Sequence, residues 1–503
     1  MIRRFTLSPP VMLVIVASLL AGELASGTSV YFASMATLAV LCACVTYNIL
    51  GGLGSMSGIA FARLALSTLV ISQVGKVIIL ERADRNLDTP EIVITVYALY
   101  FFSAMVGTLV FSRVRLPLPK PMEPETPAQA RYLYYVALAG GLVGTIGLMA
   151  EGFQGEAGMT SLAHGFSLVL SYLLPFSLVL AVDSRIRSTG GRHCFGWMAF
   201  WPTMIVEAEG FLTATRSEFV LPLATIFLTG YLRGFRFGRR HYAVAAATGL
   251  GFFLFVSPYY LYSRVWRSNP TPGELATAMI QGLESAPSQW STITSSVGND
   301  ALENTGSVNY FDSPGAVTLN RFALIGPDST LISACSTGYH YRFTSILLDL
   351  YSQIPRLLYR NKADYGSQVF LGHLDGQEAS EGDTTSFSTI TAISDSYGAF
   401  SWLGSVLFAF LVLPAVFIVY ESIFDMRTAW GTVAAVYLLQ SLTEGSMGHI
   451  ILEVLIKDPV YLLALSWIAV WLVRMIPATG DRTTMRKGPG RSDRAFTPSH
   501  EVT

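Results

Sequence analysis

The sequence is poor in charge. Of its 503 residues, 13% are charged and 51% are hydrophobic, and the mean hydropathy is +0.47. Soluble domains carry roughly 25% charged residues, so the composition excludes a large water-soluble enzyme. The aromatic content of 12% excludes a disordered chain. The net charge of −1 lacks the basic excess that binds nucleic acid, so no nucleic-acid partner is expected. The remaining class is a polytopic membrane protein.

Cysteine is equally scarce. Cys42 and Cys44 lie in an apolar run, Cys194 in a basic stretch and Cys335 in a long polar one. This spacing predicts neither a disulfide framework nor a metal site, and no metal or other cofactor is expected. Walker and dinucleotide-binding sequences are also missing, which argues against an ATP-driven transporter.

Long apolar runs, in contrast, are abundant. A helix needs about 20 apolar residues to cross the hydrocarbon core. The sequence therefore predicts an all-α polytopic membrane protein with about 12 transmembrane helices, at residues 10–27, 29–50, 61–80, 91–112, 132–150, 162–182, 197–212, 218–232, 242–263, 400–420, 429–448 and 458–476.

The basic residues predict the orientation, because short cytoplasmic loops carry an excess of Lys and Arg. With the N-terminus inside, the inner segments hold 21 Lys and Arg, counting Arg63, and the short outer segments hold 4, counting Lys457. Both termini are therefore expected to be cytoplasmic.

One connection is far longer than the others. Residues 264–399 form a 136-residue loop on the outer side, and a structureless loop of that length would be unusual. We expect an ordered loop with amphipathic helices. The predicted domains are an N-terminal bundle of about nine spans (1–263), this large loop between helices 9 and 10 (264–399), about three C-terminal spans (400–476) and a disordered tail (477–503).

Charged residues near the outer ends of the spans are candidates for a phosphate site. Glu207, Glu209, Arg216 and Glu218 lie where the seventh and eighth spans meet. Ionisable groups at membrane depth usually face a cavity or each other. Arg216 could clamp a phosphate, or it could form a structural ion pair with a neighbouring glutamate.

The long loop supplies further candidates. Its arginines could together bind a pyrophosphate, since the guanidinium fork suits phosphate, or each could be an ordinary solvated side chain: Arg264, Arg267, Arg321, Arg342, Arg356 and Arg360. Aromatic residues just before and within the loop could stack on sugars or form an interfacial belt: Tyr259, Tyr260, Tyr262 and Trp266. Four titratable residues could act as a general acid or base, or be solvated loop groups: His340, His373, Asp383 and Asp395.

Two segments resemble the O-antigen polymerase (Wzy-type) family of polysaccharide repeat-unit polymerases, which is related to the O-antigen ligases. Residues 213–221 resemble the family's Gly-Ser-Arg-Gly segment at the start of a span, although the match rests on Arg216 because the glycines are replaced. Residues 395–404 resemble the tyrosine, glycine and Leu-Gly pattern that closes the long periplasmic loop. The number of spans and the late position of the loop also match.

The resemblance implies a GT-C-like membrane glycosyltransferase of the bacterial inner membrane, acting at the periplasmic face. Its donor and acceptor would be undecaprenyl-diphosphate-linked glycans, with a chain-length regulator and a flippase as possible partners alongside membrane lipid. The product would be a surface or exported polysaccharide, such as that of lipopolysaccharide. Arg216 would contact the diphosphate, and further candidates for substrate binding are Arg264, Arg267, Arg342, Arg356, Arg360 and Glu209.

Two alternatives remain open. An O-antigen ligase-like glycan transferase would typically carry a His-Asn pair before the closing span, and residues 384–394 contain neither. This absence favours the polymerase and leaves His373 as the candidate general base. A secondary transporter would suit twelve spans, but its halves are usually related by an internal repeat, and no such repeat is evident.

Overall fold

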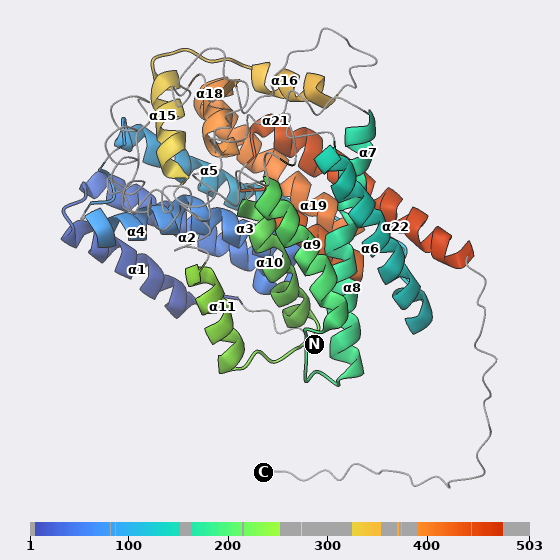
Figure 1. The fold of residues 1–503 in the computed structure, drawn as a ribbon. Coiled ribbons are helices and arrows are strands. Elements are labelled where there is room, and N and C mark those ends of the chain that lie inside the picture. Colours follow the sequence, from blue (N-terminus) through green and yellow to red (C-terminus); the bar gives the residue numbers. More distant parts are fainter. Residues whose placement is uncertain are drawn as a thin grey trace, which may run out of the picture.

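The computed structural model describes residues 6–80, 82–85, 87–150, 162–213, 216–251, 273, 324–353, 370–371, 374, 390–443 and 445–475. Throughout these ranges the regular secondary structure is helical (Figure 1). Seven helices within them are long and apolar enough to cross a membrane. The prediction of an all-α polytopic membrane protein is confirmed.

In the N-terminal part of the bundle, proline or serine residues mark the starts of several helices. The helices are α1 (Pro9–Ala25), α2 (Val30–Ile49), α3 (Met56–Ala65), the π-helical η2 (Leu66–Val70), α4 (Ile71–Leu80) and α5 (Pro90–Phe111). Proline lies in the first turn of α1 and α5, where its missing N–H costs nothing. The side chains of Ser29 and Ser55 accept hydrogen bonds from the backbone of α2 and α3, which caps these helices.

The middle of the chain adds α6 (Pro127–Ala150), α7 (Leu162–Ser171), α8 (Leu173–Ser188), α9 (Trp197–Thr213), α10 (Arg216–Leu232) and α11 (Arg239–Gly251). Glycines let α6 approach its neighbours closely. A Cβ atom on Gly141 would collide with Leu174 of α8, and one on Gly144 would collide with the backbone of α7. Small residues serve this purpose in membrane bundles, where packing rather than the exclusion of water drives helix association.

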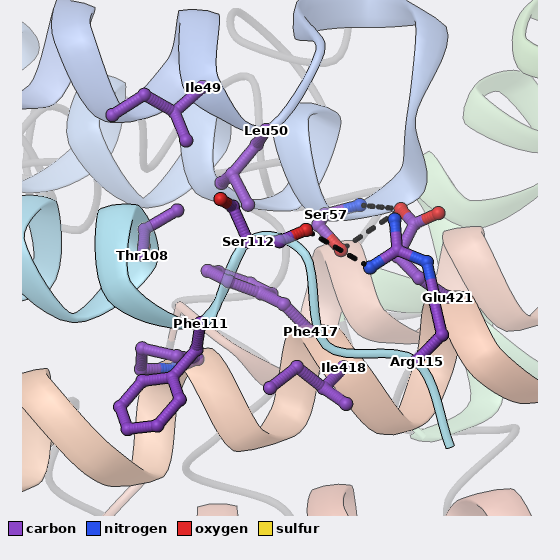
Figure 2. A pocket seen from close by; sticks show the side chains of 11 residues that line it. Ile49, Leu50, Ser57, Thr108, Phe111, Ser112, Arg115, Phe417, Ile418 and Glu421 are labelled. Carbon is purple, nitrogen blue, oxygen red and sulfur yellow. Dashed lines mark hydrogen bonds between the residues drawn. The ribbon is translucent and has the colours of Figure 1, made fainter.

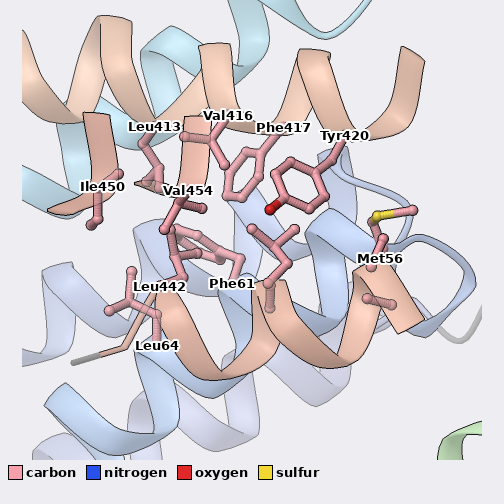
Figure 3. Close-up of a cluster of buried hydrophobic side chains, with 14 of the residues drawn as sticks. Met56, Phe61, Leu64, Leu413, Val416, Phe417, Tyr420, Leu442, Ile450 and Val454 are labelled. Carbon is pink, nitrogen blue, oxygen red and sulfur yellow. The ribbon is translucent and has the colours of Figure 1, made fainter. Parts of the chain in front are cut away.

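The C-terminal part comprises α15 (Ile325–Ser336), α16 (Thr344–Gln353), α18 (Ala392–Leu407), η7 (Phe408–Val412), α19 (Leu413–Ile423), α20 (Ala429–Ser441), α21 (Met447–His449), η8 (Ile450–Lys457) and α22 (Asp458–Met475). Its helices pack on α3 through an apolar core that includes Phe61, Phe417, Tyr420 and Leu442 (Figure 3). The rings of Phe61 and Phe417 meet edge to face at 6.2 Å. The core thus joins segments from opposite ends of the sequence.

Every one of the twelve ranges expected to span the membrane overlaps a described helix. The count of twelve crossings remains a prediction, because seven helices in the described part of the chain are long and apolar enough to span a membrane. Two charges that were counted as loop residues lie within helices that are candidate membrane spans. Arg63 lies inside the span Met56–Gly75, where it donates to Leu439 O at 2.9 Å, and Lys457 lies inside Met447–Met475.

Four linkers that together carry seven of the described basic residues lie at one end of the bundle. Arg233 donates to Arg427 O at 2.5 Å, and Lys120 donates to Ser422 O at 2.7 Å. Arg474 pairs with Glu125 at 2.5 Å. We call this the basic end, defined by linkers 112–126, 189–196, 233–238 and 424–428. The segments that the charge count places on one side of the membrane are therefore neighbours in space.

Candidate functional site

Helices from the predicted loop cover the end of the bundle opposite the basic end. Helices α15, α16 and α21 gather around the first half of α18 near the top of Figure 1. Helix α18 begins at Ala392, so the predicted domain boundary at residues 399 and 400 falls within it. We call this region the α18 junction, comprising α15, residues 339–353, residues 390–404 and α21.

Asp328 of α15 ties three helices together. Its side chain is 0% exposed and accepts hydrogen bonds from the Tyr97 hydroxyl of α5, from Thr391 N at 2.9 Å, from Thr391 Oγ1 at 2.6 Å and from Ser394 Oγ at 2.5 Å. Burial raises the pKa of this carboxyl, and the four donors oppose the rise. Thr391 is the N-cap of α18, so the carboxylate also meets the positive end of a helix dipole.

Asp395, one turn further along α18, likewise joins separate elements through its carboxylate. One carboxylate oxygen accepts from the Tyr341 hydroxyl at 2.7 Å, and the other accepts from Met447 N at 2.5 Å, at the start of α21. Burial and the charge of Asp395 raise the pKa of Tyr341 well above its ordinary value, so the phenol stays a donor. Nearby, Asp349 of α16 accepts from Ser446 Oγ at 2.8 Å.

Helix α18 is broken between these contacts and the membrane span. Phe400 and Ser401 leave the helical region, and Ser401 adopts φ 58° and ψ −150°, a conformation that is essentially reserved for glycine. Arg342, also at positive φ (52°), donates its N–H to Ala399 O at 3.1 Å, and His340 Nδ1 lies 3.2 Å from Gly398 O. The segment 340–342 thus satisfies carbonyls that the break frees.

The glycines of the 395–404 motif are explained by close contacts at this break. A Cβ atom on Gly398 would collide with the Tyr341 ring, and one on Gly404 would collide with Ser396 O across the bend. Both positions therefore require glycine for packing. The motif that carries the family resemblance accordingly encodes a sharp bend.

The groups that a substrate could reach lie on the surface above the bend. Arg342 is exposed and His340 is partly buried, while aromatic rings expose large surfaces around them, 58% for both Tyr339 and Phe343 and 39% for Trp402. A guanidinium among aromatic side chains suits a phosphate next to a sugar or a lipid. The buried carboxylates below them are engaged in hydrogen bonds and hold this surface in place.

Two of the predicted site residues, Arg342 and Glu209, have described side chains. Arg342 lies at the bend of α18, and Glu209 on α9 accepts a hydrogen bond from Thr145 Oγ1 of α6 at 2.9 Å. Arg216 is the first residue of α10, but its side chain is outside the described part of the chain. The other candidates lie wholly outside the described residues: His373, Arg264, Arg267, Arg356 and Arg360. Among the residues described, Glu209 and Arg342 form no recorded contact with each other.

The structure corrects the expectation for Asp395 and adds a residue, Asp328, that the sequence did not indicate. Reading Asp395 as a solvated loop acid is wrong, because it is 0% exposed within a helix. Asp328 and its partners were not expected from the sequence at all. The available signal was an aspartate within the apolar run of residues 324–335, a position where an ionisable group needs a partner. The partner Tyr97 lies 231 residues away and could not be inferred.

Within the described ranges, no three His, Cys, Asp or Glu side chains are arranged to hold a metal ion. The chain matches no protein-family model, no curated protein and no solved structure. The resemblance to polysaccharide polymerases therefore rests on the residues of the chain alone.

Proposed function

We propose that the chain is a membrane glycosyltransferase that polymerises undecaprenyl-diphosphate-linked oligosaccharide repeat units at the periplasmic face of a bacterial inner membrane. The observation that carries the proposal is the α18 junction, where an exposed arginine and aromatic rings are held at a bend on the end opposite the basic linkers. With the basic end in the cytoplasm, as the charge bias predicts, this surface faces the periplasm.

In this reaction the hydroxyl of an acceptor sugar attacks the anomeric carbon of the donor glycan. The bond from that carbon to the lipid diphosphate breaks, the diphosphate leaves with the electron pair, and the hydroxyl proton passes to a base, for which His373 is the candidate from the sequence. Arg342 and Arg216 are the groups that we assign to the leaving diphosphate. Stabilising charge as it develops on a leaving group is usually a large term in catalysis.

The decisive experiment supplies purified protein in liposomes with a single lipid-linked repeat unit. A ladder of products would support the polymerase. Product that forms only after a second acceptor is added would show a ligase, and no glycan transfer with either acceptor would contradict the proposal.

The site assignment is tested with Arg342→Asn. Asparagine tolerates positive φ, so the variant removes the guanidinium without adding backbone strain. We expect polymerisation to fall about a hundredfold, the usual effect of losing one charge-stabilising donor. Arg342→Lys keeps the charge without the planar fork and should retain part of the rate. Arg216→Ala should lower it similarly, and unchanged chain length in both Arg342→Asn and Arg216→Ala would overturn the assignment.

A secondary transporter remains a second candidate, because the broken helix α18 resembles the discontinuous helices that form transporter sites. Flux of an anionic solute into the same liposomes, with no glycan product, would favour it.

A further inference from the structure

A histidine, His340, lies two residues before Arg342, the arginine that we assign to the leaving diphosphate. It belongs to the segment 340–342, which satisfies carbonyls that the break in α18 frees. The proposed reaction also needs a base for the proton of the acceptor hydroxyl, and the candidate from the sequence, His373, lies outside the described residues. The contacts of His340 therefore show whether the described site contains such a base.

The imidazole of His340 has a defined orientation. Its Nδ1 lies 3.2 Å from Gly398 O, and its ring meets the buried ring of Tyr397 edge to face, with 6.2 Å between the centroids. A carbonyl oxygen can only accept a hydrogen bond, so we assign the proton of the neutral ring to Nδ1. The lone pair of the neutral imidazole is then on Nε2, and this is the nitrogen that can take up a proton.

The second nitrogen of the ring stays available. Nε2 of His340 makes no hydrogen bond with any residue in the described part of the chain, and the side chain is only partly buried. A purely structural histidine would need no more than the donor at Nδ1. A base needs in addition a free Nε2, with the other nitrogen bonded to a backbone carbonyl that fixes the tautomer.

The break in α18 places the imidazole beside the arginine. His340 Nδ1 approaches Gly398 O, and the backbone N–H of Arg342 donates to the next carbonyl, Ala399 O, at 3.1 Å. The two residues are thus fixed on consecutive carbonyls of α18. The acceptor hydroxyl and the leaving diphosphate act on the same anomeric carbon, so the groups that serve them must lie close together.

Exposed aromatic rings flank this pair. Tyr339 precedes His340, Phe343 follows Arg342, and each aromatic residue is 58% exposed. Large, rigid aromatic surfaces are suited to contact with the apolar faces of a sugar. A glycan held between these rings would have its hydroxyls within reach of the imidazole.

We propose that His340 is the general base of the polymerisation, an inference that rests on the proposed function. Nε2 takes the proton of the acceptor hydroxyl as the hydroxyl oxygen bonds to the anomeric carbon. The bond from that carbon to the diphosphate breaks, and its electron pair leaves with the diphosphate. The imidazolium adds to the positive charge that Arg342 presents to the leaving group, and it then releases the proton to water.

The test measures polymerisation by purified protein in liposomes that contain a single lipid-linked repeat unit. His340→Asn keeps an N–H donor for Gly398 O but no base. Its melting temperature should equal that of the parent, while kcat falls at least about a hundredfold, the usual contribution of general base catalysis. KM should change little, because Arg342 still binds the donor. His193→Asn, which alters an exposed histidine at the basic end, should match the parent.

Added heterocycles separate a catalytic role from a structural one. In His340→Ala, imidazole should restore part of the rate, in proportion to its unprotonated form. Pyrazole has the same ring shape and an N–H donor but is a far weaker base, so it should not restore the rate. Neither compound should raise the rate of Arg342→Asn, in which the base is intact. Equal rescue by the two compounds, or no rescue by imidazole, would overturn the proposal.

The outcomes also separate this assignment from the polymerase itself. A parental kcat in His340→Asn would overturn the assignment and leave the polymerase standing. A loss of rate in His373→Asn with an unchanged rate in His340→Asn would return the role to His373. No glycan product from the unaltered protein would overturn both the assignment and the proposed function.

Discussion

Removing the Asp328 carboxylate is expected to undock α15 from the bundle. In Asp328→Ala, Ser394 Oγ keeps its second acceptor, Thr391 O, at 3.1 Å. The Tyr97 hydroxyl, Thr391 N and Thr391 Oγ1 each lose the acceptor that Asp328 provides. Each such orphaned group costs about 1–3 kcal/mol, so docking should weaken by about 3 kcal/mol. Since a factor of ten corresponds to about 1.4 kcal/mol, the undocked population should rise more than a hundredfold.

Cys335 provides the reporter. It lies on α15, is 2% exposed, and burial together with the charge of Asp395 raises the pKa of its thiol to about 11. Both features protect it from alkylation while α15 is docked. In a background with Ser at positions 42, 44 and 194, Cys335 is the only thiol. The labelling rate with a maleimide should then rise about a hundredfold in Asp328→Ala.

Two further variants make the outcome decisive. Asp328→Asn keeps one carbonyl acceptor for Thr391 N and should fall between the parent and the alanine variant. Asp88→Ala removes an exposed aspartate near the same end and should label like the parent. If labelling in Asp328→Ala stays within threefold of the parent while the protein remains monodisperse, the carboxylate does not hold α15.

Three other outcomes follow from the α18 junction. Because the pKa of Asp328 is raised in the docked state, its protonated form favours docking. The protection of Cys335 from labelling, measured relative to the labelling rate of a free thiol at the same pH, should therefore increase as pH falls from 7.5 to 5. In Asp328→Asn this pH-dependent contribution should be lost. Gly404→Val should lower the melting temperature in detergent, since its side chain collides with Ser396 O, whereas Gly22→Ala, with open space around it, should not. Ser401→Gly should raise the melting temperature by relieving a strain of about 1–3 kcal/mol, and an unchanged or lower value would contradict strain at the bend.

The helices were predictable and their partners were not. Apolar runs of helical length set the spans, and the start of the tenth predicted span at residue 400 coincides with the break in α18. The pattern could not reveal that residues 392–399 continue as a buried helix, because their burial depends on α5 and α15. Arg63, in contrast, already falls inside the predicted span at residues 61–80, so the sequence alone could have placed it in a helix; only its acceptor, Leu439 O, is remote in sequence.

The candidate site was less accessible to sequence reasoning. The glycines and the tyrosine of residues 395–404 marked the right segment, but their tight contacts with Tyr341 and Ser396 emerge only in three dimensions. An arginine in a polar loop has the same local signature whether it is solvated or held at a bend. Only the positive φ of Arg342 and its bond to Ala399 separate it from its neighbours.

Five carboxylates in the described part of the chain, three of them buried, have a common use. At five helix starts a carboxylate from a different element accepts a backbone N–H. The free N–H groups and the helix dipole offset the cost of removing these charges from water. The carboxylates are Asp84 for α2, Glu421 for α3 (Figure 2), Asp328 for α18, Glu123 for α20 and Asp395 for α21.

This use limits the mechanism of the proposed reaction. A carboxylate that caps a helix and accepts side-chain donors at 0% exposure cannot reach an acceptor hydroxyl, so neither Asp328 nor Asp395 serves as a general base. Catalysis at the α18 junction would then depend on the histidine base and on stabilising the leaving diphosphate, the role assigned to Arg342. A rate of polymerisation that rises with pH through the ordinary range of a carboxyl, and that Asp395→Asn abolishes in a protein of unchanged melting temperature, would contradict this reasoning.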